Sequence, residues 1–361
     1  MYLILTRSFP PEVGGMQNLM WGLTNELSKH YMLKVFADYQ KNHESFDQKV
    51  SFSIERVGGI KILRKNRKAY LVNEFLKTHK TKGIIADHWK SLELIKSNKK
   101  KICLIHSKEI NHEKGTNLNK RVLNVLNNVD FIVSNSQFTR NLAISVGVNE
   151  EKIIVINPGI QEIEKPNLNF LNRVENLLKK KSPRLITISR FDKRKNHEKV
   201  VMALRNLKQI YPNIIYICIG SGDEEENVKK LVEELNLENQ VMFFKNISND
   251  FKNSLLMKSN IFVMPSIRYK KSIEGFGIAY VEAAQFGIPS IGGKDGGASD
   301  AINHNKDGLI CDGNNLDEVY SSINDLLVNK KYIDFGKLAK ENSSKFQWSK
   351  IIESYKLLLE K

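Results

Sequence analysis

The sequence lacks several features that would each point to a particular class of protein. Only three of its 361 residues are cysteines, and they form neither a Cys-x-x-Cys pair nor a cluster with paired histidines. This excludes a disulfide framework and a zinc site of the usual spacing, and it fits a reducing compartment. Long apolar runs are also absent, since 2–5 is short and 275–293 is interrupted by Glu282, five glycines and a proline. We therefore expect neither a secretion signal nor a membrane-spanning segment.

No compositional bias is present either. Hydrophobic residues make up 41% and charged residues 27% of the chain, and proline and glycine are unremarkable in number. These values exclude disordered, collagen-like and low-complexity proteins. No period of 20 to 50 residues recurs, which excludes a solenoid. At 361 residues the chain exceeds a usual domain of roughly 100–200 residues, so it predicts two domains.

Positive charge is concentrated in one part of the chain. The net charge is +16, and residues 51–100 hold 13 Lys and Arg against 4 Asp and Glu, mainly in 61–68, 77–82 and 99–101. A local basic face suits an anionic partner such as nucleic acid or anionic lipid headgroups, and it is equally typical of a solvated surface. The segment lacks the glycine and aromatic pattern of an RNA-recognition sheet, so a membrane surface is the favoured partner and no nucleic acid is expected.

Short apolar runs alternate with amphipathic stretches in both halves of the chain. This rhythm predicts two doubly wound α/β domains with parallel sheets, facing a shared cleft. The connection between them is expected at 161–183, around a helix at 168–178, and further helices at 16–27 and 228–235. The expected strands are 2–5, 33–37, 83–86, 102–105, 131–134, 153–156, 184–189, 214–219, 240–244, 261–264 and 289–291.

Ligands of open parallel sheets bind beyond the carboxyl ends of the strands, so the loops that follow strands are the candidate sites. Gly14 and Gly15 stand between the first strand and the first helix, where backbone N–H groups and the helix dipole favour an anion. Arg190 and Lys195 follow the first strand of the second domain and are suited to a phosphate or diphosphate. The turn 220–223 is interpreted as chain reversal.

The most informative segment is 272–289, in which Glu274 and Glu282 flank a glycine-rich helix start. If it were wholly helical, the two carboxylates would stand about 12 Å apart along the axis, beyond the roughly 5–9.5 Å of hydrolytic carboxylate pairs. A glycosidase dyad is therefore disfavoured. The spacing suits two ends of one extended ligand, with the N–H groups of 276–278 aimed at anionic oxygens between them.

These residues resemble the retaining glycosyltransferases of family 4, which have the GT-B architecture of two facing Rossmann-like domains. The resemblance covers nearly the whole chain. It is carried by Glu274, seven residues, Glu282, followed by Gly-Ile-Pro289, Gly296-Gly297 and Asp307-Gly-Leu309. It implies an acceptor-side domain over 1–165, a donor-binding domain over 166–345, and a final helix within 346–361 that crosses back to the first domain. Asp300 stands where the family usually has glutamate.

The resemblance also implies roles for individual residues. His106 and Glu274 would be catalytic, with Glu274 holding sugar hydroxyls and His106 near the transferred sugar, and His88 is an acceptor-side candidate. Glu282 would hold the ribose hydroxyls. The implied donor-binding residues are Gly14, Gly15, Arg190, Lys195, Phe276, Gly277, Ile278 and Glu282.

The expected reaction is transfer of a hexose from a nucleoside diphosphate sugar to a glycan or lipid-linked acceptor, with retention, in envelope polysaccharide or glycolipid assembly. The donor base is left open among UDP, GDP and ADP. No Asp-x-Asp occurs, so no metal and no cofactor are expected.

The protein is expected in the cytoplasm, bound peripherally to the inner face of the membrane through residues 61–101. Two alternatives stay open: a GT-B nucleotide-sugar epimerase, and a basic membrane- or nucleic-acid-binding module with an idle site. A sugar phosphorylase is disfavoured by the short chain.

Overall fold

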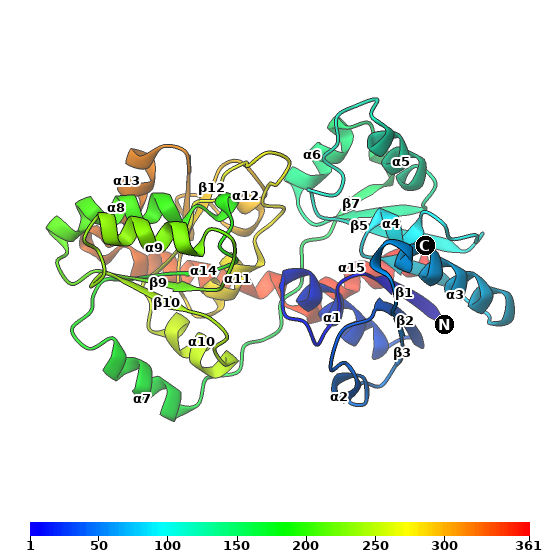
Figure 1. The fold of residues 1–361 in the computed structure, drawn as a ribbon, viewed down its shortest axis with the longest axis horizontal. Coiled ribbons are helices and arrows are strands. Elements are labelled where there is room, and N and C mark those ends of the chain that lie inside the picture. Colours follow the sequence, from blue (N-terminus) through cyan, green and yellow to red (C-terminus); the bar gives the residue numbers. More distant parts are fainter. The chain divides into compact units, whose positions relative to one another are not determined.

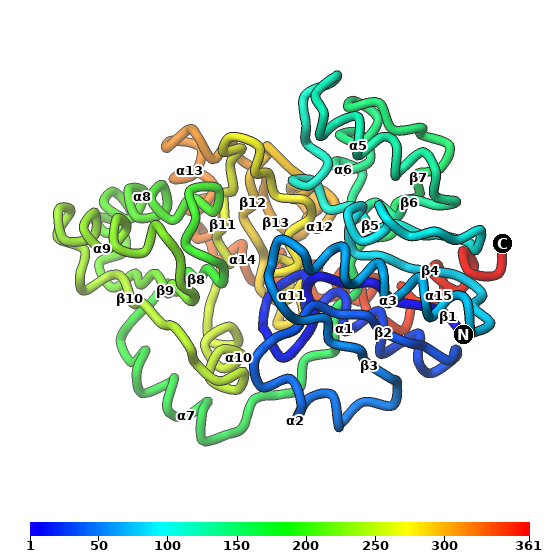
Figure 2. The backbone as a smooth tube through the Cα atoms, turned by 45° about the vertical axis from the view of Figure 1, so that its right-hand side comes forward, coloured from blue at the N-terminus to red at the C-terminus, as the bar shows by residue number.

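The computed structural model describes all 361 residues, and they form two compact units. Unit 1 comprises Met1–Gln161 together with Phe346–Lys361, and unit 2 comprises Glu162–Lys345. Each unit is an open sheet with helices on both faces (Figure 1). Both chain ends lie in unit 1 (Figure 2). No helix is both long and apolar enough to cross a bilayer.

Unit 1 contains a seven-stranded, entirely parallel sheet in the order β3-β2-β1-β4-β5-β6-β7. Its central strands are covered on both faces, which is why they read as continuous apolar runs in the sequence. The strands are β1 (Tyr2–Thr6), β2 (Leu33–Asp38), β3 (Ser53–Val57), β4 (Gly83–Ala86), β5 (Lys100–Ile105), β6 (Phe131–Ser134) and β7 (Ile153–Val155).

The helices of unit 1 bury an apolar stripe against that sheet, and several of them begin at a residue whose side chain caps the first turn. Thr116 and Ser136, for example, each accept a backbone N–H at the start of α5 and α6. The helices are α1 (Gly15–Ser28), α2 (Glu44–Asp47), η1 (Lys61–Leu63), α3 (Arg64–Thr78), α4 (Trp89–Leu92), α5 (Asn117–Leu126), α6 (Gln137–Ser145), η2 (Glu150–Lys152) and α15 (Trp348–Glu360).

Unit 2 contains a six-stranded parallel sheet in the order β10-β9-β8-β11-β12-β13. Its strands are β8 (Arg184–Ile188), β9 (Ile215–Ile219), β10 (Val241–Phe244), β11 (Ile261–Met264), β12 (Ser290–Gly293) and β13 (Gly308–Cys311). Its helices are α7 (Leu168–Leu177), η3 (Lys193–Lys195), α8 (His197–Ile210), α9 (Glu225–Glu234), α10 (Asn249–Met257), α11 (Ile278–Gln285), α12 (Ala298–Ala301), α13 (Leu316–Leu327), η4 (Val328–Lys330), α14 (Tyr332–Ser343) and η5 (Ser344–Phe346), which ends in unit 1.

Both sheets have one topological switch point, where the strand order reverses direction. It lies between β1 and β4 in unit 1 and between β8 and β11 in unit 2. Connections leave the sheet toward opposite faces there, so the loops part and leave room for a ligand at the carboxyl ends of the strands. The loops 7–15 and 87–90 lie at the first switch point, and the loops 189–196 and 265–277 lie at the second.

The predicted fold class is confirmed, and all eleven expected strands are present within two residues of their bounds. Two strands were missed. The edge strand β3 has mixed burial and no apolar run, and β13 is short and begins at a glycine. The helix expected at 168–178 belongs to unit 2, where it packs against α10 (Figure 1).

The final helix, α15, is anchored to unit 1 by one aromatic side chain. Trp348 is only 3% exposed and lies against α1 at Gly22 and against Gly159. A Cβ atom at Gly22 would stand 2.0 Å from the indole Nε1 of Trp348, so only glycine permits this approach. The backbone N–H of Trp348 also donates to Ile160 O at 3.3 Å.

Replacing Trp348 with alanine should therefore destabilise unit 1. The indole leaves a cavity between the two glycines, and loss of a buried tryptophan costs about 3–5 kcal/mol. Leu357→Ala on the same helix is the matched control, because Leu357 is 61% exposed. Its replacement should change the free energy of unfolding by no more than about 0.5 kcal/mol. Thermal unfolding followed by circular dichroism measures both; equal shifts in the two variants would contradict the assigned anchor.

Candidate active site

The loop after β8 forms a short helical turn at the switch point of unit 2. Asp192 begins this turn, η3, and its carboxylate accepts the backbone N–H of Lys195 at 3.2 Å. Asn196 ends it in the left-handed region, and its side-chain amide donates to Pro265 O at 2.9 Å and Gly313 O at 2.8 Å. These hydrogen bonds fix η3 against the carboxyl end of β11.

Two consecutive cations of η3 meet one carboxylate. Arg194 Nη1 and Lys195 Nζ each lie 2.5 Å from Glu274 Oε2. All three side chains are largely buried, with 10%, 12% and 13% of the Arg194, Lys195 and Glu274 side chains exposed. Both cations use the same oxygen, and Oε1 of Glu274 has no hydrogen-bond partner within the protein. The carboxylate is thus immobilised through one oxygen, and the other is free to accept hydrogen bonds.

The charge state of this cluster follows from its surroundings. Burial disfavours ionisation of Glu274, but the charges and hydrogen bonds of Lys195 and Arg194 outweigh it and hold the pKa at about 2. Burial also lowers the pKa of the Lys195 ammonium below its ordinary value, although Glu274 opposes this shift. Burial acts in the same direction on Arg194, but Glu274 and Asp192 outweigh it and raise its pKa.

The backbone of Glu274 is held by the loop that follows β12. Gly297 N donates to Glu274 O at 2.9 Å. A Cβ atom at Gly296 would stand 2.4 Å from that same carbonyl oxygen, so the close approach of the two loops requires glycine there. Asp300, expected to depart from the family pattern, lies in the following short helix, α12.

The structure does not bring Arg190 and Lys195 into one contact. Arg190 is on the surface, with 79% of its side chain exposed, and its Nη2 lies 3.5 Å from Asp192 Oδ2. The cation that shares Glu274 with Lys195 is Arg194, which was not predicted from the sequence. Asp192 also lies 3.9 Å from Arg194 Nη2, so it links the exposed arginine to the buried cluster. With three cations and two carboxylates, the cluster carries one uncompensated positive charge.

The helix α11 continues from this cluster. Gly277, in the left-handed region at φ +90°, precedes its first residue, Ile278, and no side chain caps the first turn. Phe276 is buried beside it. Glu282 lies one turn further on and is half-buried; burial raises its pKa, and the charge of Lys252 opposes the shift. Because α11 begins only at Ile278, Glu274 lies in the preceding loop and not on the helix with Glu282.

In unit 1 the glycine loop connects β1 to α1. Gly14 is extended and Gly15 is the first residue of α1, whose first turn has no side-chain cap. The loop is fixed by Arg56, whose Nη2 donates to Pro10 O at 2.6 Å while it pairs with Asp47. Its backbone N–H groups at the start of α1 are therefore presented at the switch point between β1 and β4.

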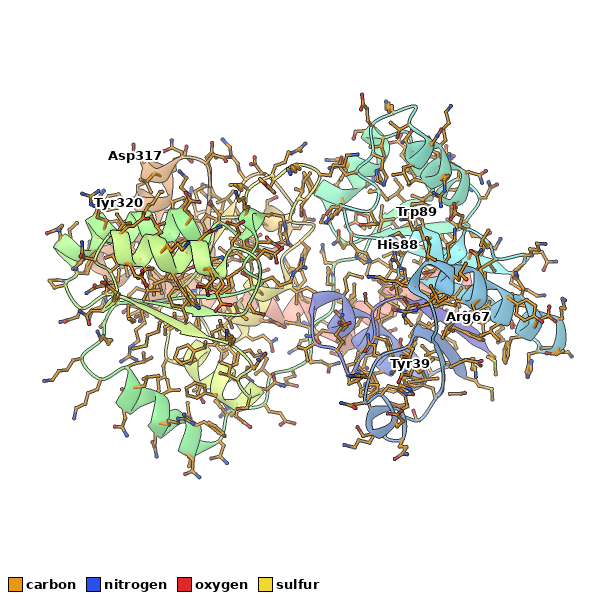
Figure 3. The ribbon with its side chains drawn as sticks, in the orientation of Figure 1. Tyr39, Arg67, His88, Trp89, Asp317 and Tyr320 are labelled. Carbon is orange, nitrogen blue, oxygen red and sulfur yellow. The ribbon has the colours of Figure 1, made fainter.

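The two predicted histidines lie at the carboxyl ends of neighbouring strands in unit 1. His106 follows β5, and its Nε2 lies 3.1 Å from Asp87 O, which can only accept, so Nε2 carries the proton. His88 follows β4 at the start of α4 beside Trp89 (Figure 3), and its Nδ1 accepts the N–H of Lys90 at 3.0 Å. Burial, with the charges of Arg7 and Lys90, lowers the pKa of His88 to about 2, so this ring is neutral.

No group of three or more His, Cys, Asp and Glu side chains is arranged to hold a metal ion. The three cysteines are free and buried, so none is presented as a nucleophile.

The chain matches two family models in succession. Residues 13–164 match "Glycosyltransferase Family 4", and residues 170–342 match "Glycosyl transferases group 1". It is similar to a GDP-mannose-dependent alpha-(1-6)-phosphatidylinositol monomannoside mannosyltransferase of Mycolicibacterium smegmatis, with 23% identity over 91% of this chain and 90% of the relative. It is also similar to an N-acetyl-alpha-D-glucosaminyl L-malate synthase of Bacillus anthracis, with 26% identity over 66% and 67%.

Solved structures share the fold over the whole chain. The structure of Anabaena Alr3699/HepE in complex with UDP superposes with a TM-score of 0.84, 19% identity and 99% coverage of both chains. Sucrose-phosphate synthase from Thermosynechococcus elongatus superposes with a TM-score of 0.84, 18% identity and coverage of 99% and 98%. The protein has the GT-B fold of two Rossmann-like domains. It belongs to the family-4 glycosyltransferases, as the resemblance in its sequence predicted.

Glu274→Gln tests the energetics of the buried cluster. The substitution leaves Arg194 and Lys195 buried without their counter-charge, which costs about 3–5 kcal/mol. In the wild type, the depressed pKa contributes stability that is fully present above the ordinary value of 4.5 and is lost as pH falls toward about 2. The variant should lack this part of the acid-dependent loss.

Urea unfolding at several pH values between neutral and acidic measures the effect. Glu353→Gln is the control, because Glu353 is 59% exposed in its pair with Lys356 and such pairs contribute about 0–1 kcal/mol. An unchanged pH profile in Glu274→Gln would refute the assigned ionisation.

Proposed function

We propose that the protein transfers a hexose from a nucleoside diphosphate sugar to an acceptor hydroxyl, with retention of the anomeric configuration and without a metal ion. The observation that carries this proposal is the ion-pair cluster at the switch point of unit 2. One oxygen of its carboxylate is fixed by two cations and the other is free. The cluster as a whole carries a net positive charge, and it lies beside the uncapped start of α11.

The diphosphate of the donor is the expected anion for this cluster. When the donor binds, Lys195 exchanges its ion pair with Glu274 for one with a phosphate oxygen, and Arg190 leaves Asp192 for the same diphosphate. The first backbone N–H groups of α11 donate to this diphosphate as well. Arg194 remains on Glu274 and keeps it ionised. Negative charge grows on the diphosphate as its bond to the sugar breaks, so these preorganised cations favour the transition state over the ground state.

The free oxygen of Glu274 accepts hydrogen bonds from hydroxyls of the hexose, and the carboxylate of Glu282 accepts hydrogen bonds from the hydroxyls of the ribose. In the transfer step the bond between the anomeric carbon and the diphosphate oxygen breaks, and the acceptor oxygen bonds to the same face of that carbon. The departing phosphate oxygen takes the acceptor's proton. The role proposed for His106 is to bind the transferred sugar through Nδ1, because its Nε2 is engaged with Asp87 O.

The names of the relatives support a small or lipid-linked acceptor. The mannosyltransferases are named for phosphatidylinositol monomannoside and the synthase for L-malate. For this protein we propose an acceptor in glycolipid or polysaccharide assembly.

A panel of UDP-, GDP- and ADP-hexoses tests the reaction. In EDTA, one nucleotide class should raise the melting temperature and release its sugar slowly, and Glu274→Ala should abolish the release. Arg190→Ala should weaken binding of that donor by about tenfold, equal to the loss of one charge-assisted hydrogen bond. Lys193→Ala is the control, because Lys193 is exposed on the same turn. Failure of every donor would refute the proposal, and anomeric inversion of a transfer product would refute retention.

We also propose that unit 1 docks on an anionic membrane through η1, the short turn that precedes α3. Ile60 and Ile62 are 68% and 84% exposed on either side of Lys61. Much of the remaining basic segment is engaged elsewhere: Lys65 pairs with Glu93, and Lys68 is buried. The docking element is therefore the short apolar tip with Lys61, and the more distant lysines contribute by long-range attraction.

Ile62→Glu tests this surface. Co-sedimentation with vesicles of equal phosphatidylglycerol and phosphatidylcholine should fall strongly in the variant, since the tip then carries a negative charge toward an anionic surface. The control is Ile210→Glu, at a residue of unit 2 that is 54% exposed. If both variants sediment like the wild type, η1 is not the docking element.

A further inference from the structure

The switch point of unit 1 is organised by one buried carboxylate. Asp87, 2% exposed, accepts from Thr6 Oγ1 at 2.9 Å, from Arg7 N at 2.7 Å and from Ser91 Oγ at 3.2 Å. Its carbonyl accepts from His106 Nε2 at 3.1 Å. The ends of β1, β4 and β5 are thereby tied together, and the charge of Asp87 is already engaged in three hydrogen bonds.

Two cations at this edge form no ion pair. In the parallel register Leu5 lies opposite Ala86, and Arg7 and His88 each follow two residues beyond this pair, at the same edge of the sheet. The Arg7 side chain is exposed and has no carboxylate partner. Lys90 is half-buried, and its ammonium lies 5.2 Å from the centre of the Trp89 ring and forms no ion pair with a carboxylate.

The neighbouring charges do not neutralise these two cations. Glu93 is shared by Lys65, at 2.8 Å, and Arg121, at 2.6 Å. Burial comes first among the causes that lower the pKa of Lys90, and the charges of Arg7, Arg121 and Lys65 lower it further, against Glu93 alone. This edge of the sheet therefore carries excess positive charge that an anion would stabilise.

His88 adds a neutral donor to the same place. Its Nδ1 accepts the backbone N–H of Lys90, so its proton is on Nε2, and that N–H has no acceptor within the protein. Arg7, Lys90 and His88 thus bring a guanidinium, an ammonium and an imidazole N–H to the same edge of the sheet, and the charges of Arg7 and Lys90 both act on His88. They match the several oxygens and the charge of a phosphoryl group.

We propose that Arg7, Lys90 and His88 form a second anion site, at the switch point of unit 1, that binds a phosphoryl group of the acceptor. This inference rests on the proposed function, because it gives unit 1 the acceptor. It extends that function by naming the acceptor's chemical class: a molecule whose sugar or lipid carries a phosphate.

Titration calorimetry of the full-length protein with inorganic phosphate at fixed ionic strength tests the site. The wild type should bind phosphate, and Arg7→Gln and Lys90→Gln should each weaken binding by about tenfold, whereas Arg7→Lys and the control Lys96→Gln should change it by less than about threefold. Equal melting temperatures of the variants exclude loss of folding. Absence of binding in the wild type, or equal losses in Lys96→Gln, would overturn the proposal.

Repeating the titration with a saturating nucleoside diphosphate separates this site from the donor site. Phosphate binding should persist; displacement by the nucleotide would assign it to unit 2 and overturn the inference. Donor binding by Arg7→Gln should equal that of the wild type. If no nucleotide binds at all but phosphate does, the proposed transfer fails while the anion site stands.

Glycerol phosphate and vesicles containing phosphatidic acid then identify the source of the phosphate. Preference for the soluble ester, abolished in Lys90→Gln, indicates a soluble phosphorylated acceptor. Vesicle binding that is lost in Lys90→Gln indicates a lipid-linked one. A failure of both probes to compete with inorganic phosphate would overturn the assignment to an acceptor.

Discussion

The structure of the candidate site depends on one shared oxygen. Glu274 gives Oε2 to both Arg194 and Lys195 and keeps Oε1 free. A carboxylate buried this deeply would otherwise be protonated, and two buried cations would otherwise repel each other; each charge is tolerated only because of the others. The turn η3, the amide of Asn196 and the loop at Gly296 all serve to bring these three groups together.

That arrangement explains why the cluster can be both stable and receptive. Arg194 and Lys195 both contact Oε2, so the proposed movement of Lys195 to a diphosphate would leave Arg194 on the carboxylate. Both units place polar groups at the same position of the same topology. In unit 2 the carboxylate of Glu274 pairs with two cations. In unit 1 the carboxylate of Asp87 accepts three other hydrogen bonds, and the side chains of Arg7 and Lys90 form no ion pair.

Much of the fold could be predicted from the sequence because buried parallel strands are apolar runs and the turns between them are polar. The edge strand β3 could not, since Ser53–Val57 alternates and borders solvent. Glu274 was predicted from its spacing to Glu282. Arg194 was not, because three consecutive basic residues look alike until the turn of η3 decides which ones face inward. Lys68 was similarly counted with the exposed basic segment, yet it is buried against the end of β1, where its ammonium donates to Thr6 O.

The most direct measurement is the affinity of Glu274→Gln for the free nucleoside diphosphate, compared with its turnover of the nucleotide sugar. If Lys195 exchanges Glu274 for the diphosphate, removing the carboxylate charge releases the cation, so the variant should bind the free nucleotide roughly tenfold more tightly. It should also turn over the sugar donor at least about 100-fold more slowly. Weaker nucleotide binding in a folded variant would contradict the account, because it would mean that Glu274 supports the diphosphate site instead of competing with it.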